Sequence, residues 1–266
     1  MLIATSIATK LIPLMFLPLF FGYFLKYKKK TVLAKETDKS LKEDALTLTP
    51  CAHLDDTPNI SIENKKSHTN VALKLSRSVF SGLPKLIAFY SIIATTILLL
   101  FAPFFTSAFI DNYYKTIGLW FGDFEFNASI YYIARAVGYW FRGWNEIAII
   151  GKILPVCVLL FVLYLSFFNK NKTTKQLIIS MLFAFTFYLF MSTTVHPWYL
   201  ATLVFLSVFT HYKFPLIWSF IIVISYFAYA NTNHSENLWI ISIEYIVVYG
   251  YFIWDVFIKH KTTKKK

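Results

Sequence analysis

Long apolar runs, separated by polar and basic stretches, dominate the sequence. There are seven, at residues 2–25, 85–108, 147–168, 177–191, 200–210, 214–230 and 238–258. A helix of about 20 apolar residues crosses the hydrocarbon core of a bilayer. The shorter runs late in the chain are expected to be extended by their flanks, to tilt less, or to lie where the bilayer is thin. The pattern predicts an all-α fold, a multi-pass transmembrane helical bundle of about seven spans.

Prolines and polar segments divide the chain further. Pro13 and Pro18 are expected to kink or break the first run, and Pro103 to bend the second. Residues 31–84 are polar, mixed in charge and poor in aromatic residues, which predicts a largely disordered cytoplasmic loop. Residues 110–146 are amphipathic and predict a loop that carries interfacial helices. The predicted parts are therefore the first span with its basic end (1–30), the polar loop (31–84), the bundle (85–258) and a basic tail (259–266).

Composition strengthens the membrane interpretation. The chain is 57% hydrophobic and 15% charged, whereas a soluble domain is about a quarter charged. The net charge of +12 would suggest a nucleic-acid partner in a soluble protein. Here the basic residues gather at the ends of the apolar runs, where they orient a membrane protein, so no nucleic acid is expected. Cys51 and Cys157 are far apart and indicate neither a disulfide framework nor a metal site.

The basic groups also predict the topology. They lie at residues 26–30, 74–85, 170–175, 213 and 259–266. With seven spans all five fall on one side, which the positive-inside rule makes cytoplasmic. The other side receives the 110–146 loop, the turn around His196 and the 231–237 turn, so the most polar stretches are predicted to converge there. Met1 would begin on that side with the span already under way, which predicts a missing N-terminal portion or a partner that supplies it.

The first candidate chemistry lies at residues 122–135, where two acids, an amide, a hydroxyl, two tyrosines and an arginine crowd together. Asp123 and Glu125 face the same way if the segment is extended. They are the candidate catalytic residues, because paired carboxylates serve in general acid–base chemistry or hold a divalent cation. The alternative is a solvated loop face. The sequence predicts no cofactor and no resident metal site, and it leaves a divalent cation at this pair open.

A helix is predicted at residues 130–140. It places Tyr131, Arg135 and Tyr139 on one face. The planar guanidinium of Arg135 suits a lipid-linked phosphate; the alternatives are snorkelling to headgroups or an ion pair with Glu125. Lys152 is a cation within an apolar run, and it either faces a phosphate-bearing lipid or pairs with an acid.

A second candidate stretch is the turn that runs from His196 through a proline and a tryptophan to Tyr199. The imidazole of His196 can transfer a proton or donate a hydrogen bond to a phosphate or a hydroxyl. The aromatic rings suit stacking on a sugar or a plain membrane interface. Glu244 is an acid within the last apolar run, so it is expected to pair with a cation such as Lys10, Lys152 or Arg135.

Residues 124–135 (Phe-Glu-Phe-Asn-Ala-Ser-Ile-Tyr-Tyr-Ile-Ala-Arg) and 194–200 (Thr-Val-His-Pro-Trp-Tyr-Leu) resemble the C-terminal half of bacterial multi-pass GT-C glycosyltransferases. The most similar group is the mannosyltransferases of Bacteroidota-type bacteria. Residues 8–18 of this chain also resemble the mid-chain helix of these enzymes. The resemblance covers residues 1–30 and about 85–258. It implies a GT-C-like fold in the bacterial inner membrane, and inverting transfer of a sugar from a polyprenyl-phosphate donor to an extracytoplasmic glycan or lipid acceptor.

One departure from the family pattern limits the site assignment. Such enzymes carry their catalytic acid in the first large extracytoplasmic loop, in a half that is absent here. The resemblance therefore implies a separately encoded N-terminal half and assigns the present residues to donor binding. These are Glu125, Asn127, Tyr131, Arg135, Lys152, His196 and Tyr199.

Two other functions use similar parts. A lipid-linked oligosaccharide polymerase or ligase also acts outside the cytoplasm on a lipid-linked sugar. A transporter or flippase-like protein belongs to another class, and it predicts paired internal repeats with broken helices. The sequence shows no such repeats, and most of its charges lie near the ends of the spans.

Overall fold

The computed structural model describes residues 3, 12–25, 82–169, 171, 173–230 and 236–259. Within these residues the fold is all-α, as predicted. Four helices are long and apolar enough to cross a membrane, at Leu83–Phe104, Ile147–Phe167, Thr174–Met191 and Leu238–Ile258. Three shorter apolar helices, Ile12–Leu25, Pro197–Val208 and Phe214–Ala230, overlap the other predicted runs, the first over residues 12–25 of the predicted 2–25. The four long helices define a multi-pass membrane protein.

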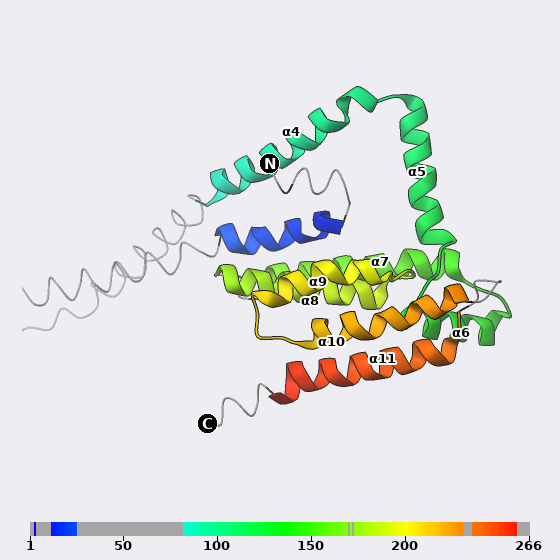
Figure 1. Cartoon of the computed structure of the whole chain (residues 1–266). Helices are drawn as coiled ribbons and strands as arrows, with labels where there is room; N and C mark the ends of the chain where they lie inside the picture. Colours follow the sequence, from blue (N-terminus) through cyan, green and yellow to red (C-terminus); the bar gives the residue numbers. More distant parts are fainter. Residues whose placement is uncertain are drawn as a thin grey trace, which may run out of the picture.

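The second half of the chain forms a bundle of helices that lie side by side (Figure 1). Its members are α7 (Ile147–Phe167), α8 (Thr174–Met191), α9 (Leu200–Val208), α10 (Phe214–Ile221) with its 3-10 continuation η4 (Ile222–Ala230), and α11 (Leu238–Ile253) with its π-helical continuation η5 (Trp254–Ile258). Fully buried Phe185, Leu203 and Trp218 lie in the core between them. The outer faces expose large apolar side chains such as Phe220 and Ile246, which suits a lipid surround.

The helix at residues 12–25 lies between α4 (Leu83–Phe101) and the bundle (Figure 1). It begins with a tight 3-10 turn, η1 (Ile12–Phe16), at the predicted proline break. Gly22 allows close packing on α7, because a Cβ there would lie 2.8 Å from the carbonyl oxygen of Ser166. On the other side, the hydroxyl of Tyr90 donates to the carbonyl oxygen of Leu17 at 2.8 Å.

The predicted bend of the second span is confirmed near Pro103. There α4 passes into the short η2 (Ala102–Phe104), so the span ends four residues earlier than residue 108. A new helix, α5 (Ser107–Gly122), starts at once, because the side chain of Thr106 accepts a hydrogen bond from the amide of Phe109 at 3.1 Å. Most of the predicted 110–146 loop is therefore helical, in α5 and in α6 (Ile130–Arg142).

The helix predicted at residues 130–140 is confirmed as α6, whose helical spacing places Tyr131, Arg135 and Tyr139 on one side. Tyr131 is fully buried and Tyr139 is half exposed. On the opposite side Ile133, Val137, Trp140 and Phe141 are exposed at helical spacing, so α6 is amphipathic. Both α5, which runs crosswise to the bundle, and α6 lie at the same end of the bundle (Figure 1).

The opposite end is held by Asp255, which is fully buried on η5. Its Oδ2 accepts hydrogen bonds from the backbone amides of Lys213 and Phe214, the latter at 3.0 Å, so it caps the start of α10. Its Oδ1 forms an ion pair with Lys259 at 3.2 Å. Lys213 and Lys259 therefore lie at one end, as the charge pattern predicted.

Several predictions fall on residues that the structure does not describe. They include Lys10, the basic group at 26–30, and residues 260–266 of the tail. Most of the loop predicted at residues 31–84 also lies outside the described residues, up to residue 81. The helix α4 begins at Leu83, two residues before the predicted start of the second span.

Candidate functional site

The two polar stretches singled out in the sequence lie against each other at one end of the bundle. Phe126 and Thr194 form a parallel β-bridge. The amide of Phe126 donates to the carbonyl of Thr193 at 3.0 Å, and the amide of Val195 donates to the carbonyl of Phe126 at 2.8 Å. The predicted convergence of the 110–146 stretch with the His196 turn is thus confirmed.

Asn127 fixes the segment of residues 123–129 to the bundle. It is fully buried and has a φ of +46°, in the left-handed region that asparagine tolerates better than most residues. Its amide donates to Glu236 Oε1 at 2.6 Å, its side-chain Nδ2 donates to Glu244 Oε1 at 3.1 Å, and its carbonyl accepts from the hydroxyl of Tyr245 at 2.7 Å. Three separate groups therefore hold one residue in an unusual backbone conformation.

Glu125 is the centre of the polar cluster next to Asn127. Its Oε1 forms an ion pair with Arg135 Nη1 at 2.5 Å, and its Oε2 accepts from the hydroxyl of Tyr131 at 2.6 Å. Asn145, just before α7, adds a longer contact to Oε2 at 3.5 Å. The guanidinium of Arg135 also lies 4.4 Å from the ring centroid of Tyr132, a cation–π contact. The ion pair that the sequence left open as an alternative for Arg135 is therefore formed.

A second carboxylate, Glu236, faces the same cluster from the segment before α11. It accepts a hydrogen bond from the hydroxyl of Tyr132 in addition to the amide of Asn127. Burial raises the pKa of Glu236, and burial together with the nearby carboxylate of Glu236 raises the pKa of Tyr132. The sequence analysis did not name Glu236. The available signal was its position in a turn predicted to lie on the same side as Glu125.

His196 lies between aromatic rings beside this cluster. Its ring stacks on Trp198 with centroids 4.2 Å apart, and on Phe126 at 4.9 Å, while Tyr199 meets it edge-on at 5.5 Å. Its Nδ1 is buried and has no hydrogen-bond partner among the described residues. Burial lowers the pKa of His196, so the imidazole is expected to be neutral at pH 7.

Some predicted site residues do not join the cluster. Asp123 is the residue just after α5, its side chain is exposed, and no contact found within the described residues joins it to the cluster. Lys152 is exposed on α7, and none of the contacts found in the described part of the chain ties it to the cluster. Glu244 was expected to pair with a cation such as Lys152 or Arg135. This prediction is wrong for both residues, because the partner of Glu244 is the uncharged amide of Asn127.

No set of three or more acidic, histidine or cysteine side chains within the described ranges is placed to hold a metal ion. A divalent cation held by Asp123 and Glu125 alone stays a prediction.

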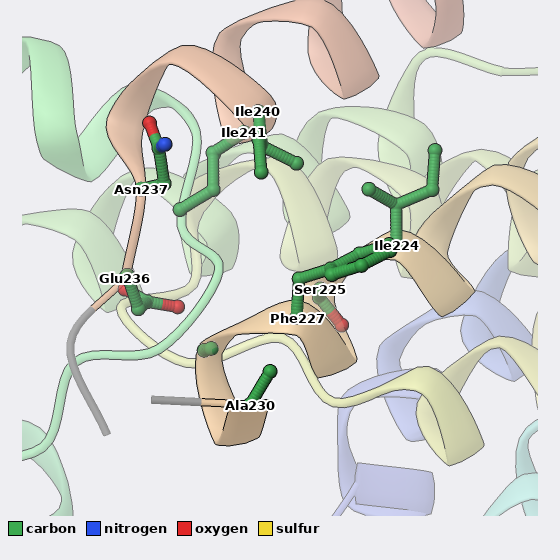
Figure 2. A pocket seen from close by; sticks show the side chains of 9 residues that line it. Ile224, Ser225, Phe227, Ala230, Glu236, Asn237, Ile240 and Ile241 are labelled. Atoms are coloured by element: carbon green, nitrogen blue, oxygen red, sulfur yellow. The ribbon is translucent and has the colours of Figure 1, made fainter. Parts of the chain in front are cut away.

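A pocket of about 230 Å³ adjoins the cluster, between η4 and the start of α11. Figure 2 shows its walls: Ile224, Ser225, Phe227 and Ala230 from η4, and Glu236, Asn237, Ile240 and Ile241 from the segment that leads into α11. The pocket is largely apolar, and Glu236 links it to the cluster through the amide of Asn127.

No protein-family model, no curated protein and no solved structure matches this chain. The fold and the site together define a multi-pass membrane protein that carries a polar cluster of carboxylates, an arginine and stacked aromatic rings at one end of its helices.

The stacked, partly buried position of His196 leads to a testable prediction about the pKa of its imidazole. Its depressed pKa means that any stabilisation from the neutral, buried ring is present above the unfolded pKa of about 6.5 and is lost as the pH falls through the lower folded value. We expect the ¹³C-labelled imidazole of His196, assigned by its absence in His196→Gln, to titrate below about 6.5 in lipid nanodiscs. A midpoint at or above that value would contradict the buried environment.

Proposed function

We propose that this chain is a membrane glycosyltransferase, or the C-terminal part of one, that moves a sugar from a polyprenyl-phosphate donor to a glycan or lipid acceptor. Mannose is the sugar that we propose first. The observation that carries the proposal is the docking of the Glu125–Arg135 segment against the His196 turn at the end of an apolar bundle.

The chemistry of such a transfer supports this proposal. Breaking a glycosyl–phosphate bond needs hydrogen-bond donors or cations at the leaving phosphate and an acid or base near the acceptor hydroxyl. Within the described residues, Nη1 is the only nitrogen of Arg135 found to donate a hydrogen bond. Its remaining N–H donors are therefore available to a phosphate. Glu125 orients the guanidinium, and the ring of Trp198, which is 53% exposed, offers a face for a sugar.

The proposed topology follows from the same observations. We place all seven apolar helices across the membrane in a GT-C-like arrangement, with the cluster on the extracytoplasmic side of the bacterial inner membrane. The basic Lys213 and Lys259 at the far end support this orientation by the positive-inside rule. The exposed apolar side of α6 suits the interface on the cluster's side.

The decisive experiment follows radiolabelled mannose from polyprenyl-phosphate-mannose in native membranes that contain the full chain or its variants. Arg135→Ala is expected to reduce transfer about 100-fold, because it removes donors aimed at the developing charge. His196→Ala is expected to reduce transfer as well. The matched control is Arg142→Ala, which removes an arginine that is 61% exposed on the same helix and pairs with Glu146 instead.

The outcomes separate the candidate functions. Unchanged transfer in both the Arg135 and His196 variants would remove the site assignment. Label that appears in a lengthened lipid-linked chain would identify a polymerase or ligase. Label that crosses the bilayer while still attached to its donor would identify a transporter or flippase-like protein and overturn the proposed transfer reaction.

A further inference from the structure

The side chains of Asn127 and Glu244 form a hydrogen-bonded pair that lacks one donor. Asn127 Nδ2 donates to Glu244 Oε1 at 3.1 Å, and both residues are 0% exposed. The second oxygen of each side chain, Asn127 Oδ1 and Glu244 Oε2, is also buried and has no hydrogen-bond partner in the part of the chain that the structure describes. Buried polar atoms in proteins are nearly always paired, so two orphaned oxygens on one pair of side chains call for a physical reason.

A single proton on Glu244 would give both of these oxygens a hydrogen bond. An ionised carboxylate and an amide oxygen are both acceptors and cannot bond to each other. If Oε2 of Glu244 carries a proton, it becomes the donor that Asn127 Oδ1 lacks. The two side chains then exchange two hydrogen bonds, one in each direction. The same proton removes a negative charge from the interior of the bundle.

Burial and the carboxylate of Glu236 favour the protonated form of Glu244. The titratable groups that interact with Glu244 are Glu236 from the segment before α11 and Tyr245 on its own helix; Tyr245 in turn interacts with Tyr132 of α6 and with Tyr249. The helix α10 places the indole N–H of Trp218 beside Glu244, where it favours the ionised carboxylate and opposes the effect of burial and of Glu236. Among the described residues no lysine or arginine pairs with Glu244, and one neighbour is a second carboxylate. An unpaired buried carboxylate is costly in such surroundings, and the usual response is to bind a proton.

We propose that Glu244 and Asn127 form a proton-binding site, in which Glu244 carries a proton that it donates to Asn127 Oδ1 and so latches residues 123–129 onto α11. Since the latched segment also carries Glu125, the polar cluster is assembled when the site holds its proton. The docked state gains this proton, so docking is favoured at low pH and weakens as the pH rises through the pKa of the site. The site is independent of the transfer reaction proposed above.

The first test uses Glu244→Gln, because the glutamine amide keeps the donor that the proton supplies. Hydrogen–deuterium exchange of residues 124–129 is compared between the wild-type chain and the variant from about pH 5 to about pH 9, after correction for intrinsic exchange. We expect the wild type to lose protection about tenfold relative to the variant at the alkaline end. Equal protection of both chains across the range would overturn the proposal.

The neighbouring acid Glu236 provides the matched control. Glu236→Gln removes the only other carboxylate that, within the described residues, bonds to Asn127. If the alkaline loss of protection persists in Glu244→Gln but vanishes in Glu236→Gln, the titrating group is Glu236 and the proposal fails. If protection depends on sodium and not on pH, the site holds a metal cation, and the proposal fails as well.

A second measurement does not require Glu244→Gln to fold. Infrared spectra of the wild type and of Glu236→Gln at neutral pH are examined for the C=O stretch of a protonated carboxylic acid. We expect this band in both, and its loss in both as the pH rises. Its absence from the wild type, or its disappearance in Glu236→Gln, would show that Glu244 is ionised and would overturn the proposal.

Discussion

Replacing Glu125 with alanine is expected to reduce sugar transfer about 100-fold and to destabilise the protein by roughly 2 kcal/mol. The substitution removes the counter-charge of Arg135 and the acceptor of the Tyr131 hydroxyl at once. The side chain of Arg135 is 19% exposed, so water relieves only part of the lost interaction. Transfer is measured in native membranes, and stability is measured by thermal unfolding of the purified chain in detergent.

Asp123→Ala is the matched control for this prediction. It deletes an exposed acid two residues away that lies at the end of α5 and outside the cluster. We expect it to change stability by less than about 0.5 kcal/mol, and to leave transfer near the wild-type level. Glu125→Gln keeps an acceptor for Tyr131 but loses the charge, and it should fall between the two. Equal losses in the Asp123 and Glu125 variants would show that the cluster geometry does not matter.

Replacing Asp255 with alanine is expected to give the largest loss of stability, about 3–5 kcal/mol. The fully buried carboxylate accepts from two backbone amides at the start of α10 and pairs with Lys259. Its removal leaves buried donors without an acceptor and separates α10 from the end of α11. The expected readout is a lower unfolding midpoint of the purified chain, with the other end of the bundle affected only through global unfolding.

Two variants sharpen the test at Asp255. Asp255→Asn keeps an oxygen for the amides of Lys213 and Phe214, so it should cost less than alanine, since only the charge is lost. Asp111→Ala removes an exposed acid of α5 and should stay within about 0.5 kcal/mol of the wild type. A loss in Asp255→Ala no larger than that in Asp111→Ala would contradict the role of Asp255 as a cap.

Carboxylates fasten the chain at both ends of the bundle, but in different ways. Asp255 binds backbone amides and has a lysine beside it. Glu244 binds the side chain of Asn127 and has no such cation within the described ranges. We therefore expect the end with Asn127 to respond to alkali as the proposed proton-binding site loses its proton.

The sequence predicted the helices well and the connections between them less well. The runs ending at residues 168 and 258 were predicted to within about a residue, because apolar composition continues up to the end of each helix. The helix α5 was not recognised, because its polar and apolar residues alternate with a weak period and its start depends on the side-chain cap at Thr106. Asp123 and Glu125 were treated as a pair, since the spacing alone does not show that α5 ends at Gly122, directly before Asp123.

By itself the sequence determined that this is an all-α membrane protein with its polar residues gathered between spans. The length of an apolar run and the position of the lysines are local properties of the sequence, and they decide which segments enter the bilayer and in which orientation. Only the tertiary structure decided which of these polar residues meet. Asn127 binds acids 109 and 117 positions away, and Arg135 binds Glu125 in place of Glu244. Such pairings depend on the packing and register of helices in three dimensions, and no spacing along the chain encodes them.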